Sequence, residues 1–401
     1  QIGGCFPVAF DVPSTLVFLG FIPLDILSTL LIWQVGWFTV WGGIGQAVGI
    51  YPRVSDRGSG AVESGIRETW SFPKLNNIDM GVVIGIALFL IWNSRDHLRN
   101  VLGALRGRKD LDDPGFSYKI SVPLFFACLI IWWAMWIGSG AIASWSLIMI
   151  VWQLLGAIGL MRIRGEFWRG GNGLGWGLGI WGNYTTLMSM GATTQFRQSP
   201  STFVTLALAQ FDVRDVDNKN DFCTRVPDCL KVSADVGGID RQIIVAIILS
   251  TIAGILFAAG LRMWIGYSGH TVFVHGEQYW GPTGFYNGTA PAPSVQEAMP
   301  IYWVGTALGF VLMFLKARFA WWPLNPIGIA VVHAGWINPN FTVTIIVSFV
   351  VKYLVWKLGG AKAQRIVMLF ATGFLGGFYI KELISFIAGF FIIGVPNIPP
   401  P

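Results

Sequence analysis

The chain has 401 residues, of which 54% are hydrophobic and 12% are charged, and its formal net charge is +6. Soluble domains carry about 25% charged residues, so this composition excludes a soluble globular enzyme and a disordered protein. The small positive charge follows Lys and Arg in loops, without a basic patch interleaved with aromatic residues, so nucleic-acid binding is not expected. The 50 glycines and 20 tryptophans are typical of membrane proteins, because Gly permits close helix packing and Trp favours the membrane interface.

Apolar segments divide the chain into a series of predicted membrane spans. A helix needs about 20 apolar residues to cross a hydrocarbon core of about 30 Å. Segments of this kind occupy residues 16–40, 78–92, 120–137, 142–161, 243–265, 301–315, 323–337, 341–356 and 366–393. The sequence therefore predicts an all-α polytopic integral membrane protein with about nine transmembrane helices, in a single transmembrane domain over residues 1–401. Because the chain begins with Gln1, we expect a processed form or the C-terminal part of a longer chain.

Two apolar segments contain residues that disfavour a regular helix. Residues 170–193 are rich in glycine, which costs roughly 1 kcal/mol per residue against Ala in a helix. We expect this segment to be re-entrant or closely packed, and a full span is the alternative. Residues 323–337 contain Pro323 and Pro326, and a break of this kind in a bilayer needs protein or a water-filled cavity to satisfy the freed backbone groups. Interrupted hydrophobic segments are also typical of transporter binding sites.

The charges of the loops predict the orientation of the chain. The loop 95–119 contains six Lys and Arg residues and is expected in the cytoplasm, whereas the loop 266–300 contains none and is expected outside. A polar insert at 194–240 carries Cys223 and Cys229. If residues 170–193 cross the membrane, this insert becomes external, and a disulfide between the two cysteines is then expected.

Ionisable and polar residues inside apolar segments are the first candidates for a functional site, because they are costly in a membrane. Asp25 lies near the middle of the predicted span 16–40. Two roles are open for Asp25. One is structural, as a hydrogen-bond partner of a helix or a partner of an Arg, and the other is functional, as a site for a proton or a cation. Asn325 and His333 lie in the Pro-broken segment, where His333 is either a packing residue or a contact for a substrate.

Charged residues near two predicted helix ends form a second group of candidates. Arg162, Arg164 and Glu166 mark a cytoplasmic helix end under the positive-inside rule, and a gate network is the alternative. Lys381 and Glu382 are adjacent on the last predicted helix. Neighbouring residues do not share a helix face, so each is expected to have another partner.

The sequence contains no strong signature of catalysis or of a cofactor. His270, His275 and Glu277 are suitable metal ligands, but their spacing matches no strong motif, and solvation in a loop is the simpler interpretation. There is no H-E-x-x-H, P-loop, G-x-S-x-G or C-x-x-C-H motif. We therefore expect no enzymatic activity, no cofactor and no bound metal.

Several short motifs follow one another along the chain. In order they are Phe21-Ile22-Pro23-Leu24-Asp25, Arg95-Asp96-His97-Leu98-Arg99, Arg162-Ile163-Arg164-Gly165-Glu166, Trp322-Pro323-Leu324-Asn325-Pro326-Ile327-Gly328, Lys352 with Leu358-Gly359-Gly360, and Gly373-x-x-x-Gly377. Together they resemble the uncharacterised prokaryotic membrane proteins related to the oligopeptide transporter superfamily. The resemblance implies a secondary transporter of the cytoplasmic (inner) membrane that uses an ion gradient to move a small peptide or another small polar solute. It implies ion coupling by Asp25 and substrate or ion contacts by Asn325, His333 and Glu382, with membrane lipids around the protein.

A structural role is the alternative hypothesis. The chain would then be a non-catalytic membrane scaffold or a subunit of a larger membrane complex, with its Gly-rich faces and its tryptophans contacting helices, lipids or pigments. The absence of a strong substrate motif in the sequence favours this alternative. We further expect the chain to form a homo-oligomer or to be a subunit of a membrane complex.

Overall fold

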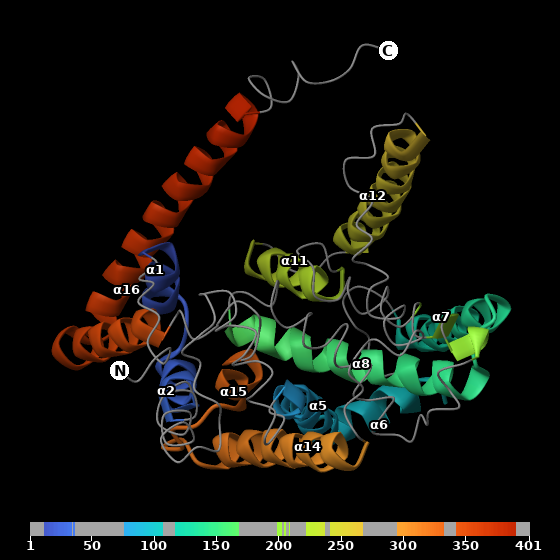
Figure 1. Ribbon diagram of the computed structural model, residues 1–401, viewed down its shortest axis with the longest axis horizontal. Helices are drawn as coiled ribbons and strands as arrows, with labels where there is room; N and C mark the ends of the chain where they lie inside the picture. The colour runs from blue at the N-terminus through green and yellow to red at the C-terminus, as the bar shows by residue number, and fades with distance from the viewer. Residues whose placement is uncertain are drawn as a thin grey trace, which may run out of the picture.

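The computed structural model describes residues 12–33, 35–36, 76–106, 117–167, 199–202, 204–205, 208, 222–236, 241–267, 295–332 and 342–389, which form helices and no strand (Figure 1). The helices are α1 (Val12–Gly20), α2 (Leu24–Trp33), α5 (Asn76–Asn93), α6 (Arg95–Ala104), α7 (Tyr118–Gly138), α8 (Ala143–Glu166), α11 (Phe222–Val236), α12 (Arg241–Tyr267), α14 (Val295–Arg318), α15 (Pro326–Val332) and α16 (Thr342–Gly389). The predicted all-α class is therefore confirmed for the described residues.

Three of the described helices are long and apolar enough to cross a membrane: α7, α8 and α16. Shorter apolar helical stretches occupy Leu24–Trp33, Gly81–Asn93 and Gln242–Phe257. These features agree with a membrane protein, and α5, α7, α8 and α12 coincide with predicted segments. The nine predicted crossings stay a prediction.

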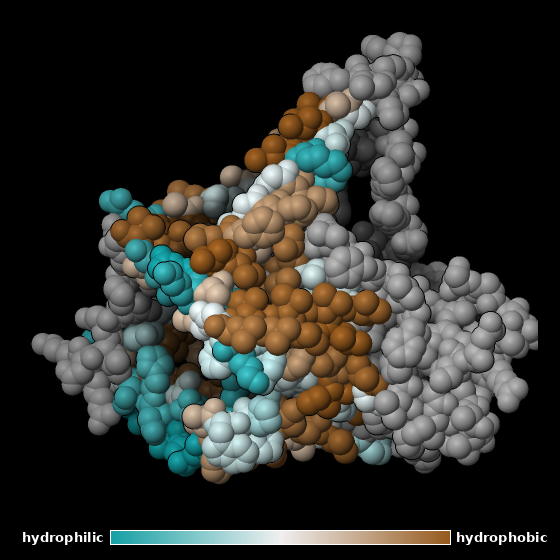
Figure 2. Space-filling view, turned by 90° about the vertical axis from the view of Figure 1, so that its left-hand side faces the viewer, coloured by the Kyte–Doolittle hydropathy of each residue, from teal (hydrophilic) through white to brown (hydrophobic). Residues whose placement is uncertain are grey.

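Apolar side chains also cover much of the surface of the described helices. In α7 only 6% of the apolar window is buried, and in α16 Leu369, Phe370 and Ile380 are each about 60% exposed. Figure 2 shows broad apolar areas on one face of the molecule. Soluble monomers rarely expose apolar surface on this scale, so these faces fit lipid or other apolar partners.

The predicted span 16–40 is wrong as a single helix. Helix α1 ends at Gly20 and α2 begins at Leu24, with Pro23 between them. Pro lacks a backbone N–H and its ring hinders the preceding turn, which explains the break. Asp25 consequently lies in the first turn of α2 and not in the middle of a span.

Helix α16 joins two predicted segments, 341–356 and 366–393, through a bend. It contains 48 residues, and Gly360 within it has φ 58° and ψ −156°. This positive φ strongly favours Gly, which has no Cβ. The two parts of α16 run in different directions in Figure 1, so the bend at Gly360 divides the helix.

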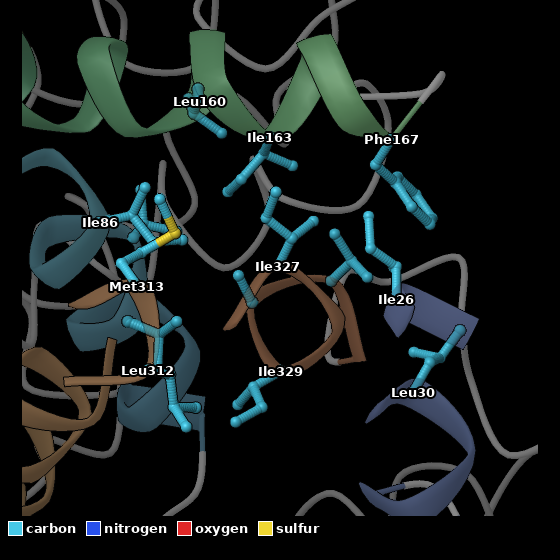
Figure 3. Close-up of a cluster of buried hydrophobic side chains, with 14 of the residues drawn as sticks. Ile26, Leu30, Ile86, Leu160, Ile163, Phe167, Leu312, Met313, Ile327 and Ile329 are labelled. Atoms are coloured by element: carbon cyan, nitrogen blue, oxygen red, sulfur yellow. The ribbon is translucent and has the colours of Figure 1, made fainter. Parts of the chain in front are cut away.

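The hydrophobic core surrounds the short helix α15. Figure 3 shows side chains from α2, α5, α8 and α14, and from Phe167 directly after α8, around those of Ile327 and Ile329 on α15. The labelled neighbours are Ile26, Leu30, Ile86, Leu160, Ile163, Phe167, Leu312 and Met313. An isolated helix of this length is unstable, so packing in the core must maintain α15. The Pro-broken segment is therefore central to the fold.

Helices α5 and α14 pack with their backbones in close contact. Each has two glycines at small-xxx-small spacing, Gly81 and Gly85 on α5 and Gly305 and Gly309 on α14. A Cβ atom at any of these positions would overlap backbone atoms of the facing helix. Small residues let helices in membranes approach closely, so these four glycines set the distance between the two helices.

Gly373 and Gly377 have the same small-xxx-small spacing, but no close crossing is present there among the described residues. A Cβ atom at either position would meet nothing within 4 Å. Both glycines lie on the second part of α16, whose side chains are mostly exposed. Small-xxx-small spacing shows that a close approach is sterically allowed, but a facing helix is also required.

Gly85→Ala is expected to lower the free energy of unfolding by about 1–3 kcal/mol, because the new methyl group overpacks the contact with Thr306 and Phe310. The matched control is Gly377→Ala, which fills open space and gains up to about 1 kcal/mol of helix propensity. Thermal unfolding of both variants in detergent measures the difference. Shifts of the same sign and size would contradict the packing of α5 on α14.

Candidate functional site

Asn325 is the buried centre of a polar cluster. It lies between α14 and α15 and its exposed fraction is 0%. Its Oδ1 accepts a hydrogen bond from the backbone N–H of Ile327 at 3.0 Å, while Pro326 occupies the first position of α15. An Asn cap followed by Pro is a favourable start for a helix. The Pro-broken sequence therefore encodes the beginning of α15.

The side-chain amide of Asn325 also joins two carboxylates. Its Nδ2 donates to Asp25 Oδ2 at 3.0 Å and to Glu166 Oε2 at 3.1 Å. The ammonium of Lys316 lies 2.7 Å from Asp25 Oδ2 and 3.1 Å from Glu166 Oε2. The same two carboxylate oxygens thus share an amide and an ammonium, and hydrogen bonds of this charge-assisted kind are strong.

Arg162 completes this cluster, which we call the charge network: Asp25, Arg162, Glu166, Lys316 and Asn325. Arg162 pairs with the Oε1 atom of Glu166 one turn later on α8. Two acids and two bases make the network neutral, as required for charges withdrawn from water. The side chains are 19% exposed for Glu166, 29% for Lys316, 30% for Asp25 and 43% for Arg162, so water still reaches its edge.

Helix ends supply the charged residues of the network. Asp25 is in the first turn of α2 and Lys316 is in the last turn of α14, where the helix dipoles favour their charges. Glu166 is the final residue of α8, where the dipole opposes a negative charge, and Arg162 and Lys316 compensate for this. The network therefore links the ends of α2, α8 and α14 to the start of α15.

Two hydroxyl groups on α2 support the network. Thr29 Oγ1 donates to the backbone carbonyl of Asp25 at 2.8 Å and accepts from the backbone N–H of Asn325 at 2.8 Å. Ser28 Oγ lies 2.8 Å from the carbonyl oxygen of Asp25 and 3.1 Å from that of Pro323. These contacts fix the first turn of α2 against the Pro-broken segment.

The structure brings four of the predicted site residues together, Asp25, Arg162, Glu166 and Asn325. Arg164 lies in the last turn of α8, in the same segment of the chain. Other predicted residues fall outside the described part of the chain: His333, His270, His275 and Glu277, together with the segment 170–193. Within the described residues, no group of three or more His, Cys, Asp and Glu side chains is placed to hold a metal.

Glu382 is separate from the network. It pairs with the ammonium of Lys381 at 2.7 Å on α16, and the two side chains are 49% and 67% exposed. The two neighbours pair with each other, which was not expected, because long side chains on adjacent residues can bend toward each other at a surface. Lys381 also has a further partner, since its Nζ lies 5.8 Å from the centre of the Phe378 ring. Nothing in this contact indicates a substrate site.

A disulfide between Cys223 and Cys229 was expected only if residues 170–193 cross the membrane, and it is not present in the structure. Cys229 is exposed with a free thiol, and both residues belong to the continuous helix α11. Six residues of helix separate their Cα atoms by about 9 Å, beyond the roughly 7 Å that a disulfide can bridge. The predicted polar insert 194–240 thus contains the helix α11.

The sequence analysis did not select Lys316, Thr29 or Lys352 as candidate site residues, although Lys352 is part of the family motif. Lys316 directly follows the predicted span 301–315, where a basic residue also fits the positive-inside rule. Thr29 lies one helical turn after Asp25, on the same face, which is a signal for a partner. Lys352 stands inside the apolar segment 341–356, where an ionisable residue is a candidate for function.

Comparison with known proteins gives a family but no activity. The model of a family of unknown function, DUF6785, matches residues 58–398. No curated protein and no solved structure matches the chain. Because the matched region covers most of the sequence, the chain belongs to the family of unknown function DUF6785.

Proposed function

We propose that this protein is a multi-pass secondary transporter of the prokaryotic cytoplasmic membrane, similar to the oligopeptide transporter superfamily. It would use an ion gradient to move a small peptide or another small polar solute. The observation that carries this proposal is the charge network, because its bonds hold the ends of three helices to a Pro-broken segment. Ionisable groups in such segments are typical of ion pathways and gates.

The network has the chemistry of a gate that a proton or a cation can open. Asp25 and Glu166 share the ammonium of Lys316 and the amide of Asn325. A proton on either carboxylate removes one negative charge and weakens its attraction for Lys316. The ends of α2 and α14 are then held less tightly. Both α8 and α14 end at positions that the basic residues predict to be cytoplasmic, which favours a gate on that side.

Asp25→Asn is expected to abolish proton-coupled uptake, because the amide cannot exchange a proton or carry the charge that attracts Lys316. The wild-type chain is reconstituted in liposomes containing a pH-sensitive dye, with an inward proton gradient, and a mixture of di- and tripeptides is added outside. Peptide-dependent acidification of the lumen is expected for the wild type and not for the variant.

The matched control for this experiment is Glu382→Gln, which neutralises a carboxylate at an exposed ion pair away from the network. It is expected to transport like the wild type. If Asp25→Asn acidifies the lumen at the wild-type rate, Asp25 does not take part in ion coupling. Folded wild-type protein that moves none of these peptides would end the peptide proposal.

A scaffold or subunit is the second candidate function, and one observation favours it. Helices α7 and α12 expose large apolar side chains, including Ile130 at 63% on α7 and Leu256 and Phe257 at 68% and 72% on α12. Such faces fit neighbouring subunits as well as lipids. The mass of the complex after extraction in mild detergent separates the two functions. A different protein at fixed stoichiometry would favour the scaffold, and a homo-oligomer would favour the transporter.

A further inference from the structure

The break between α1 and α2 leaves backbone carbonyl groups without helical partners. In an α-helix the carbonyl of Leu19 would accept from the N–H of residue 23, but residue 23 is Pro and has no N–H. The N–H of Phe21 still bonds to the carbonyl of Val17 at 2.9 Å, so α1 is regular up to this point. The unsatisfied oxygen is therefore a direct consequence of Pro23.

A buried ammonium fills the place of the missing donor. Lys352 Nζ lies 2.9 Å from the carbonyl oxygen of Leu19 and 2.6 Å from that of Ile22. Lys352 is only 7% exposed. Among the described residues, no carboxylate forms an ion pair with it, so the positive charge rests on backbone dipoles.

Both parts of α16 enclose this position. Lys352 comes before the bend at Gly360, and Gln364 comes after it and donates from Nε2 to the carbonyl of Leu19 at 3.0 Å. Beyond Gln364, a Cβ atom at Gly20 would lie 2.9 Å from the Cβ of Ala371. The second part of α16 thus packs directly on the end of α1 and helps to exclude water from the carbonyl groups.

We propose that the carbonyl oxygens of Leu19 and Ile22 form a site for a monovalent cation, and that the Lys352 ammonium is its resident cation. Backbone carbonyls can replace the hydration shell of an alkali metal ion, and unwound helix segments use them for this purpose. The ammonium of a lysine side chain supplies the same charge without a free ion. Its bonds also hold α16 against the break between α1 and α2. This inference does not depend on transport.

Removal of the ammonium is expected to make the protein depend on a free cation. Lys352→Ala is purified in detergent, and its unfolding temperature is measured in choline, sodium, potassium and ammonium chloride at equal ionic strength. In choline we expect a drop of several degrees relative to the wild type, with recovery in at least one salt of a small cation. The wild type is expected to unfold at the same temperature in all four salts.

The matched control is Lys362→Ala, which removes an exposed lysine from the same helix and is expected to behave like the wild type. A Lys352→Ala variant that is equally destabilised in all four salts would overturn the proposal. So would a variant as stable as the wild type in choline.

The wild-type protein provides a second test if Lys352→Ala does not fold. Reductive methylation modifies free amines, and mass spectrometry identifies the modified lysines. Lys362 is expected to react in the folded protein, whereas Lys352 is expected to react only after unfolding, because its Nζ is held by two carbonyl oxygens. Methylation of Lys352 at the rate of Lys362 would show that the ammonium is not resident.

Discussion

Lys316→Met is expected to lower the free energy of unfolding by about 2–3 kcal/mol. The variant leaves Asp25 Oδ2 and Glu166 Oε2 against the same Asn325 amide without the ammonium that both contact. Breaking a fully buried ion pair costs about 3–5 kcal/mol, and the smaller value here reflects side chains that are 19–30% exposed. Titration with a denaturing detergent, followed by tryptophan fluorescence, measures this loss.

Neutralising the two acids tests whether charge is the cause of that loss. The triple variant Lys316→Met, Asp25→Asn, Glu166→Gln is expected to be more stable than Lys316→Met alone, because it leaves no unpaired carboxylate. Lys381→Met is the control at an exposed pair and is expected to cost within about 0.5 kcal/mol. Losses of similar size in Lys316→Met and Lys381→Met would contradict a network that stabilises the fold.

The positions of the helices could be predicted because apolar length is a local property of the sequence. The segment 120–137 became Tyr118–Gly138, and the segment 243–265 became Arg241–Tyr267. The break at Pro23 was visible in the sequence, but the apolar length of 16–40 outweighed it in the prediction. A proline alone does not decide a boundary, because α7 continues through Pro123 and α14 through Pro300, whereas α1 and α2 are separated at Pro23.

The residues of the site could be predicted better than their arrangement in space. Asp25 and Asn325 stood out because polar side chains in apolar segments need partners, and Glu166 stood out with Arg162 and Arg164 at a predicted helix end. Their meeting could not be predicted, since Asn325 is 300 residues from Asp25 and 159 from Glu166. Packing around α15 brings them together, and no local pattern encodes it. Lys316 fits the positive-inside rule whether or not it has a partner. Its place in the sequence therefore could not show whether it only marks a cytoplasmic helix end or also pairs with carboxylates.

Asn325→Asp is expected to destabilise the protein by about 3 kcal/mol or more, and by more than Asn325→Ala. Asp keeps an acceptor for the N–H of Ile327, and Asp and Asn are equally good helix caps. It loses both Nδ2 donors, however, and puts a third negative charge beside Asp25 and Glu166. Each lost bond to a charged group is worth about 1.5–3 kcal/mol, and the repulsion adds to this loss. If capping of α15 were the only role of Asn325, the Asp variant would match the wild type.

A second substitution separates repulsion from misfolding. Glu166→Gln in the background of Asn325→Asp returns the network to two acids and supplies a new amide donor, so it is expected to recover part of the lost stability. Asn93→Asp is the control at an exposed position near the end of α5, and it is expected to change little. Unfolding temperatures in detergent for these variants give the result. If Glu166→Gln is as harmful in the Asn325→Asp background as in the wild type, the two side chains do not interact, and the geometry of the network is wrong.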